Sequence, residues 1–260
     1  MKKNYSNHII LFLLLTIVIV LSLFNSKSII SGFTQNKNNK ISIVVPCIPR
    51  DVKHLDRLMN SIKNQTYKPH EIVIAMSGQS DMESEKLKQL LINKHQLPIK
   101  FSNINIKQYA SENRNRGAKN CSGNIISFMD ADDVMYPDKL LYVNKTFNYY
   151  HPKIFIHGYS KGYNKFQKND INPNIFLGSQ IYDIAEKQRT LGLDKKMHHG
   201  HTSIDSSVIN DIKFREGDKY KRGQDCWFIR DVLKHYGRND DTAVFIDIPL
   251  SQYVPAFNQK

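Results

Sequence analysis

The chain has 260 residues, of which 40% are hydrophobic, and this is enough for one α/β domain with an ordinary core. Its formal charge is +13, from 37 basic and 24 acidic residues. A basic excess can indicate nucleic-acid binding, but here the lysines and arginines are scattered and no zinc-finger or RNP-type motif is present. We therefore expect no nucleic-acid partner. We attribute the charge to attraction toward phosphorylated ligands, acidic glycans or an anionic membrane.

The N-terminus opens with a long apolar run. Residues 9–24, IILFLLLTIVIVLSLF, carry no charge, and residues 25–30 extend the run to the length of a membrane-spanning helix, with Lys27 reaching toward the interface. Lys2 and Lys3 precede the run, so the positive-inside rule keeps the short N-terminus in the cytosol. A cleaved signal peptide is the alternative, although no A-x-A-like cleavage site follows.

We expect a single-pass type II membrane protein whose main domain is lumenal, as in the Golgi or endoplasmic reticulum, or extracytoplasmic. The polar stretch after the apolar run, SGFTQNKNNK, has no periodicity and indicates a short stem. Four segments follow from this interpretation: a cytoplasmic tail over 1–8, a signal anchor over 9–30, a stem over 31–40 and the main domain over 41–260.

The main domain begins by alternating buried strands with amphipathic helices. The first stretch, ISIVVP, is continuous and rich in β-branched residues, which is typical of a buried strand that ends at a proline. We expect strands over 41–46, 71–75, 99–106 and 124–129, and helices over 51–64, 83–94 and 112–121. Such alternation implies a mostly parallel sheet with right-handed crossovers, as in a Rossmann-like nucleotide-binding half.

The fourth strand runs directly into a carboxylate cluster, Asp130-Ala131-Asp132-Asp133. Open α/β sheets bind ligands outside the carboxyl ends of their strands. Three acids there repel one another unless a cation lies among them, and their hard oxygen ligands suit Mg²⁺ or Mn²⁺. The polar segment upstream, which includes Arg114, can contact a phosphate or ribose held by the same metal. Together these residues predict a metal-dependent nucleotide-sugar site.

Two later stretches also carry chemistry. The run His198-His199-Gly200-His201 places three imidazoles within four residues, any of which can bind a divalent metal. Asp225 opens the last helix, where the helix dipole stabilises its anion, although capping is an ordinary role for aspartate at such a position. The other elements we expect are a helix over 137–147, strands over 153–157 and 243–248, a helix over 229–236, and a loop over 158–175 whose aromatic residues can stack on sugar rings.

The motifs around the acidic cluster resemble those of family 2-like glycosyltransferases with a GT-A fold. That family has approximately ARNxG, then AxGxxIxFLDxDD, then PxxL. The chain reads Arg114-Asn115-x-Gly117, then Gly123-x-Ile125-Ile126-x-Phe128-Met129-Asp130-x-Asp132-Asp133, then Pro137-x-Lys139-Leu140. Farther on, Gly223-Gln224-Asp225 is similar to the Gly-Glu-Asp motif that opens a helix in the family.

The resemblance implies a GT-A fold and a hexosyltransferase-like enzyme. Such an enzyme moves a sugar from a nucleotide-sugar donor, here a UDP-sugar, to a hydroxyl of a glycan, glycoprotein or glycolipid acceptor, with inversion. It also implies Mn²⁺ or Mg²⁺ bound by a DxD motif, Asp130 and Asp132, and by a late histidine, His199 or His201. Asp225 is then the catalytic base. The remaining implied contacts are Gln224 and Trp227 to the acceptor, and Pro46, Ser77, Arg114, Asn115, Asp130 and Asp132 to the donor.

The chain departs from the family in two places. Its second strand runs into Met76-Ser77-Gly78-Gln79, where the family usually has Asp-Asp-Gly-Ser, so the acid that helps to hold the base is absent. Gln224 stands where the family usually has glutamate. These changes leave open a catalytically inactive GT-A-fold protein that binds a glycan or a partner. A nucleotidyltransferase is a further alternative, but the loop after the first strand lacks the glycines that such enzymes carry.

Overall fold

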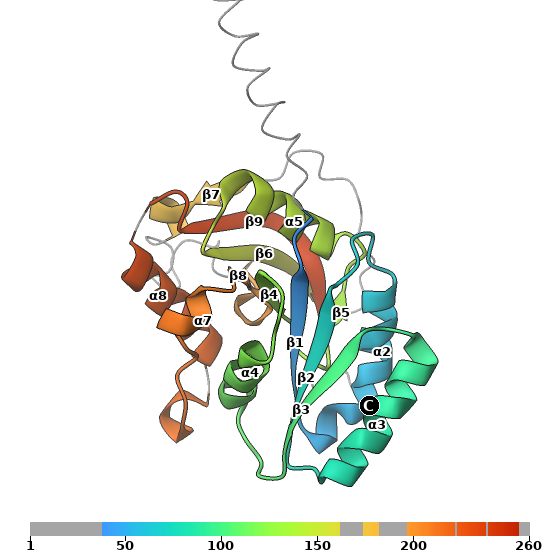
Figure 1. The fold of residues 1–260 in the computed structure, drawn as a ribbon. Coiled ribbons are helices and arrows are strands. Elements are labelled where there is room, and N and C mark those ends of the chain that lie inside the picture. Colours follow the sequence, from blue (N-terminus) through green and yellow to red (C-terminus); the bar gives the residue numbers. More distant parts are fainter. Residues whose placement is uncertain (1–37, 162–173, 182–196, 222, 238, 255–260) are drawn as a thin grey trace, which may run out of the picture. The chain divides into compact units, whose positions relative to one another are not determined.

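The computed structural model describes residues 38–161, 174–181, 197–221, 223–237 and 239–254, which are the coloured ribbon in Figure 1. The expected signal anchor, the expected stem up to residue 37 and most of the loop over 158–175 lie outside these residues. Among the described residues, no helix has both the length and the apolar character needed to cross a membrane.

One half of the sheet is parallel, as the alternating pattern predicts. Its strands lie in the order β3-β2-β1-β4, and each neighbouring pair is parallel. The strands are β1 (Ile41–Cys47), β2 (Glu71–Ser77), β3 (Ile99–Ile104) and β4 (Ile125–Phe128), and the helices between them are α2 (Val52–Lys63), α3 (Asp81–His95) and α4 (Ala110–Lys119). Because β1 and β4 pair in parallel, the loops that follow their carboxyl ends leave the sheet at the same edge.

The other half of the sheet is mixed, which corrects the expectation of a mostly parallel sheet. Beyond β4 the order continues β8-β6-β9-β5, and β7 also pairs with β9. β6 and β9 are parallel, whereas β8 is antiparallel to both of its neighbours and β5 and β7 are antiparallel to β9. The elements are β5 (Val134–Met135), α5 (Lys139–Tyr150), β6 (Ile154–Lys161), β7 (Ile175–Leu177), β8 (Ser203–Asp205), α7 (Val208–Asp211), α8 (Gln224–Tyr236), β9 (Ala243–Tyr253) and the 3₁₀ turns η1 (Pro49–Asp51), η2 (His199–His201) and η3 (Asp218–Tyr220).

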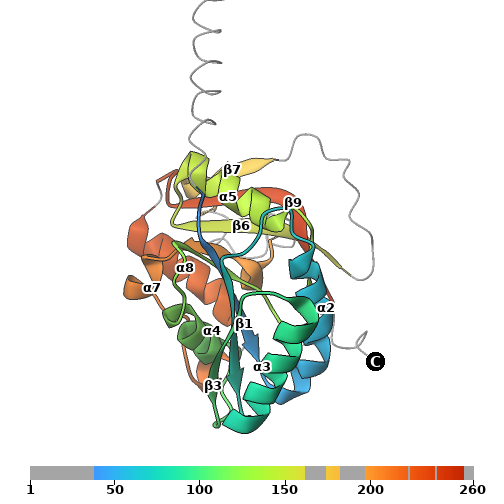
Figure 2. The ribbon, with the colours of Figure 1, turned by 45° about the vertical axis from the view of Figure 1, so that its right-hand side comes forward.

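Helices cover both faces of the sheet, and each face has its own apolar cluster. In Figures 1 and 2, α2 and α3 lie next to each other on one side, and α4 lies on the other side with α7 and α8. Successive residues of β1 point to opposite faces, so Ile43 and Val45 pack with α2 while Val44 packs in the cluster that includes α8. The predicted helix over 51–64 is confirmed, and its four apolar residues at helical spacing are all buried.

The antiparallel pairing of β8 with β4 decides what lies beside the acidic cluster. The Phe128 amide donates a hydrogen bond to the Thr202 carbonyl at 2.9 Å, at the end of β4. The turn η2 immediately precedes Thr202, so its histidines lie next to the chain that leaves β4. Two stretches about seventy residues apart in the sequence therefore form one site.

Candidate active site

The acidic cluster forms a tight turn at the carboxyl end of β4. The Asp133 amide donates to the Asp130 carbonyl at 3.3 Å. Asp133 is fully buried, and its Oδ1 accepts a hydrogen bond from the Val254 amide at 2.7 Å. Asp132 is partly exposed and lines the cleft described below. The turn thus directs one carboxylate into the protein and another toward solvent.

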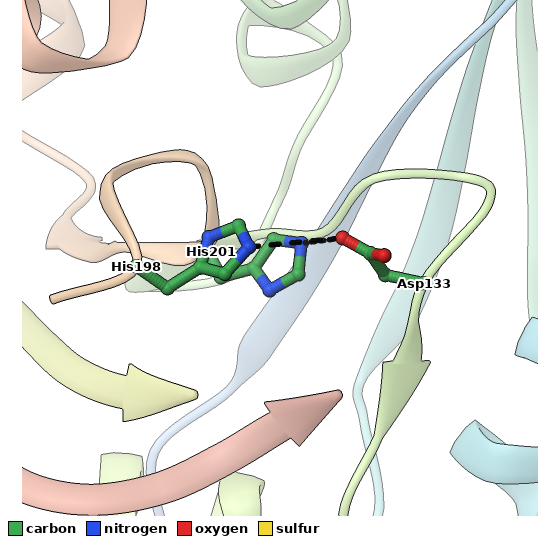
Figure 3. Close-up of side chains that lie close together, drawn as sticks. All are labelled: Asp133, His198 and His201. Carbon is green, nitrogen blue, oxygen red and sulfur yellow. Dashed lines mark ion pairs between the residues drawn. The ribbon is translucent and has the colours of Figure 1, made fainter. Parts of the chain in front are cut away.

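Two histidines approach the buried end of this turn, as Figure 3 shows. His201 Nε2 lies 3.1 Å from Asp133 Oδ2 and 3.7 Å from Asp130 Oδ2. His198 Nε2 lies 3.7 Å from Asp133 Oδ2, and the two imidazole rings stack with their centroids 3.5 Å apart. On its other side, His201 Nδ1 is 2.7 Å from Ser251 Oγ on β9. Asp133, His198 and His201 thus form a group whose ligand atoms could hold one metal ion.

The positions of the carboxylate and imidazole atoms fit two ligands of one shared cation better than two partners in a direct hydrogen bond. Asp133 Oδ2 and His201 Nε2 are both buried, and neither makes a hydrogen bond within the described part of the chain, although they are only 3.1 Å apart. Two ligand atoms about 2.1 Å from one ion and at right angles to each other lie about 3.0 Å apart. A second shell is also present, because the hydroxyl of Ser251 can fix the tautomer that leaves Nε2 unprotonated.

The electrostatics of the turn favour an added positive charge. Burial, together with the charges of Asp130 and Asp132, raises the pKa of Asp133 to about 9. Burial lowers the pKa of His201 well below its ordinary value, so its ring is neutral at pH 7. Burial also lowers the pKa of Lys139, on α5, to about 7, although Asp130 and Asp133 favour its charged form. A bound cation would relieve the repulsion among these acids.

Arg114, on α4, holds the first acid of the turn. Its guanidinium is buried and donates to Asp130 Oδ1 at 2.6 Å. Burial raises the pKa of Asp130 nevertheless, because Arg114 offsets the cost of burial only in part. A Cβ on Gly200 would stand 3.1 Å from Asp130 Oδ2 and 3.3 Å from the Arg114 guanidinium, so a glycine allows η2 to approach this pair.

A cleft runs past the acidic turn and consists of two adjoining cavities. One, of about 300 Å³, contains the turn and the start of α8; the other, of about 460 Å³, extends between the loops after β1 and β3. These volumes are in the range of small-molecule sites. The smaller cavity is lined by Pro46, Arg50, Asp51, Ala110, Arg114, Asp130, Ala131, Asp132, Gly223, Gln224 and Asp225. The larger is lined by Pro46, Cys47, Ile48, Arg50, Asp51, Lys107, Gln108, Tyr109, Ala110, Asn113, Lys221 and Gln224.

The start of α8 brings a further carboxylate to the cleft. Gly223 is the N-cap, with φ +70°, so Asp225 lies inside the first turn and its Oδ1 accepts from the Cys226 amide at 2.9 Å. Asp225 lines the smaller cavity together with Asp132. Gln224 lines both cavities, and its buried Oε1 has no hydrogen-bond partner among the described residues. Gln224 therefore borders the space where a ligand would lie.

The comparisons with known proteins agree with this arrangement. Residues 42–212 match the model of glycosyl transferase family 2. The chain belongs to that family. A Campylobacter jejuni GalNAc(5)-diNAcBac-PP-undecaprenol beta-1,3-glucosyltransferase is 33% identical over 36% of this chain and 30% of its own length. Glycosyltransferase GlyA of Streptococcus pneumoniae is 32% identical over 47% of this chain and 17% of its own length. The chain thus matches less than a third of either relative.

Solved structures share the fold at low identity. The S. aureus TarS fragment 1–349 superimposes with a TM-score of 0.61 at 18% identity, over 83% of this chain and 60% of that one. Mannosyltransferase PcManGT from Pyrobaculum calidifontis, solved with GDP-Man and Mn²⁺, gives a TM-score of 0.53 at 12% identity, over 81% of this chain and 57% of that one. The GT-A-like fold of this family 2 protein is therefore confirmed.

Two residues expected to bind the donor make other contacts. Ser77 is fully buried, and its Oγ accepts from Asn113 Nδ2 at 2.9 Å and from the Gln108 amide at 3.1 Å. Asn115 is bonded in both directions to the backbone of Phe214, at 2.8 and 2.9 Å. Neither Ser77 nor Asn115 is among the described residues that line the cleft, whereas Pro46, Arg114, Asp130 and Asp132 line it.

Trp227 and His199 are two further residues that were expected in the site. The guanidinium groups of Arg215 and Arg230 lie 4.5 and 4.8 Å from the centroid of the Trp227 ring. Trp227 is not among the described residues that line the cleft. Its expected contact with the acceptor stays a prediction. The side chain of His199 lies outside the described part of the structure.

Asp133 and His198 stood in the acidic cluster and the histidine run, but the family resemblance implied Asp130, Asp132, His199 and His201 as the metal ligands. The signal for His198 was its spacing, because side chains at i and i+3 eclipse in a 3₁₀ turn and this stacks His198 on His201. Asp133 stood in the motif itself, but only the direction of the turn reveals that its carboxylate points inward. Arg50 and Asp51 were missed as well, and they line both cavities.

Proposed function

We propose that this family 2 protein transfers a sugar from a UDP-sugar to a hydroxyl of a glycan, glycoprotein or glycolipid acceptor, with inversion. The observation that carries the proposal is one cleft that joins the acidic turn after β4 to Asp225 at the start of α8. Support comes from the TarS fragment, which has been solved with UDP and with UDP-GlcNAc and shares the fold. Both cavities together offer room for a nucleotide and a sugar.

A divalent metal belongs to this proposal. Asp133, His198 and His201 would hold it, with Asp130 and Asp132 on the side of the cleft. Two imidazoles make Mg²⁺ the poorer fit, because imidazole suits transition metals, so we favour Mn²⁺. When bound, the metal would supply Lewis-acid stabilisation of the charge on the departing diphosphate.

The residues of the chain have separate tasks in the reaction. Asp225 accepts the proton of the acceptor hydroxyl while the oxygen of that hydroxyl attacks the anomeric carbon of the donor sugar. The bond between the anomeric carbon and the diphosphate oxygen breaks in the same step. Arg114 holds Asp130 in place through its hydrogen bond. Gln224, which lines both cavities, contacts the acceptor at the position where the family usually has glutamate.

A nucleotide-release assay on a panel of nucleotide sugars tests the proposal. We expect release of one nucleoside diphosphate with Mn²⁺, weaker release with Mg²⁺, and none with EDTA. Asp132→Asn should lose release, while Glu85→Gln on the exposed side of α3 should not. No release from any donor, combined with retained glycan binding, would favour the inactive GT-A-fold alternative instead.

We further propose that residues 9–30 anchor the chain as a single-pass type II membrane protein with its main domain lumenal or extracytoplasmic. The motivation is the uncharged apolar run after Lys2 and Lys3. The full chain should remain with membranes after alkaline carbonate extraction and be protected from protease only in sealed vesicles of the matching orientation. Recovery of the intact chain in the soluble fraction would contradict the anchor.

A further inference from the structure

Asp51 is an acidic residue at a helix start that does not cap its helix. It occupies the N-cap position of α2, where aspartate ordinarily bonds the first free amides, yet its side chain makes no capping bond. The reason is its backbone, which is already helical at φ −91° and ψ −9° because η1 runs into α2. Its Oδ1 instead accepts from Arg50 Nε at 2.9 Å. The ordinary structural role of this aspartate is therefore unfilled.

The position of Asp51 points to a ligand. Arg50 and Asp51 line both cavities of the cleft, and Asp51 is the one acid that the two cavities share among the described residues. Cys47, at the end of β1, lines the larger cavity together with Asp51. Burial, and then the charges of Asp51 and Asp132, raise the pKa of Cys47. Asp51 thus stands between the acidic turn and the larger cavity.

A nucleotide sugar would cross this junction with its ribose. If the diphosphate and sugar lie beside Asp132 and Asp225, the base must extend into the larger cavity and the ribose falls between them. A carboxylate can accept hydrogen bonds from two vicinal hydroxyls, and an acidic residue performs this task for the ribose in dinucleotide-binding folds. Asp130 is less suited to it, because Arg114 already occupies its Oδ1.

We propose that Asp51 binds the ribose hydroxyls of the donor nucleotide and that Arg50 positions its carboxylate. This inference rests on the proposed function and adds a donor contact to the cleft. Asp51 supplies a carboxylate on the donor side of the cleft. The loop after β2, Met76-Ser77-Gly78-Gln79, supplies none. Because the contact is to the ribose, it is independent of which base the larger cavity accepts.

Calorimetric titration of the full chain in detergent with UDP and with 2′-deoxy-UDP, both in the presence of Mn²⁺, tests the contact. GDP and 2′-deoxy-GDP form a second pair of probes. We expect the native chain to bind the ribonucleotide roughly tenfold more tightly than its deoxy form, as for a hydrogen bond to a charged group. Asp51→Asn should lose most of this preference while its affinity for the deoxy form changes little. Arg50→Gln, which keeps Asp51, should lose part of it.

The control is Asp56→Asn, the same substitution on α2, where the carboxylate bonds Lys94 and His95 away from the cleft. It should keep the full preference for ribose. Equal affinity for both nucleotides in the native chain, or an undiminished preference in a folded Asp51→Asn variant, would overturn the inference while leaving the proposed function in place. Failure of the native chain to bind any of the four nucleotides would overturn both.

Discussion

His201 shows how much of a site can depend on one buried side chain. Its Nε2 faces Asp133, its Nδ1 faces Ser251, and its ring stacks on His198, so both nitrogens and one face of the ring have a defined neighbour. The neutral ring that burial enforces is also the form that binds a metal. A histidine with these contacts is suited to bind a metal ion, and a measurement of Mn²⁺ binding tests this role.

Removal of the ring should therefore remove the metal. We expect His201→Ala to abolish Mn²⁺ binding measured by electron paramagnetic resonance, and Ser251→Ala to weaken it about tenfold or more, because second-shell partners orient the ligand. His70→Ala, an exposed histidine bonded to Ser122, is the control and should bind Mn²⁺ normally. Unchanged Mn²⁺ binding in a folded His201→Ala variant would contradict this role. Asp133 and His201 would then form a buried Asp–His pair that binds no metal.

At the scale of single residues, the sequence predicted the position of some side chains at the cleft and not of others. Asp130, Asp132 and Asp225 could be placed at the cleft from the motif and its spacing, and they line it. Ser77 and Asn115 occupied motif positions too, but their direction depends on hydrogen bonds to segments far along the chain, which spacing alone does not reveal.

The parallel strands depend on a buried acid that links them. Glu71 on β2 accepts from Ser42 on β1 at 2.7 Å and from Lys100 on β3 at 2.5 Å, and its Oε1 also accepts from the Ser122 amide and hydroxyl. Burial alone would raise the pKa of Glu71, but Lys100 and the hydrogen bonds of Ser122 and Ser42 outweigh it and hold the pKa at about 2.

This low pKa has a consequence for stability. A carboxyl whose pKa falls on folding contributes stability above its unfolded pKa, and that contribution disappears as the pH drops through the folded value. We expect Glu71→Gln to cost roughly 2 to 3 kcal/mol at pH 7. The difference from the native chain should shrink between about pH 4.5 and pH 2. Urea unfolding across this range measures it, and a difference independent of pH would contradict the assignment.

The elements themselves were predictable where they are long and periodic. The strands and helices of the parallel half all appear near their expected ranges. The strands and α2 carry apolar runs or an apolar stripe, whereas α4 is polar and was placed from the motif that contains Arg114 and Asn115. β5, β7 and β8 have only two or three residues, too few to carry a period, and they form because longer strands lie beside them. Strands were predicted over 153–157 and 243–248, where β6 and β9 lie, but the antiparallel pairing of the mixed half was not foreseen.

At the scale of the whole molecule, the site is divided between the two halves of the sheet. The parallel half supplies the β1 loop, Arg114 and the acidic turn, and the later part of the chain supplies the histidines and Asp225. The antiparallel pairing of β8 with β4 joins these contributions. A donor bound by the first half and an acceptor activated by the second would meet at the smaller cavity.

The most direct test of this account compares donor binding with transfer in Asp225→Asn. We expect the nucleotide dissociation constant to stay within about twofold of the native value while the transfer rate falls at least about a hundredfold, as for the loss of a general base. Asp240→Asn, in the exposed loop before β9, is the matched control and should retain full activity. Full transfer activity in Asp225→Asn would contradict the account, because the proton would then have to leave by another route.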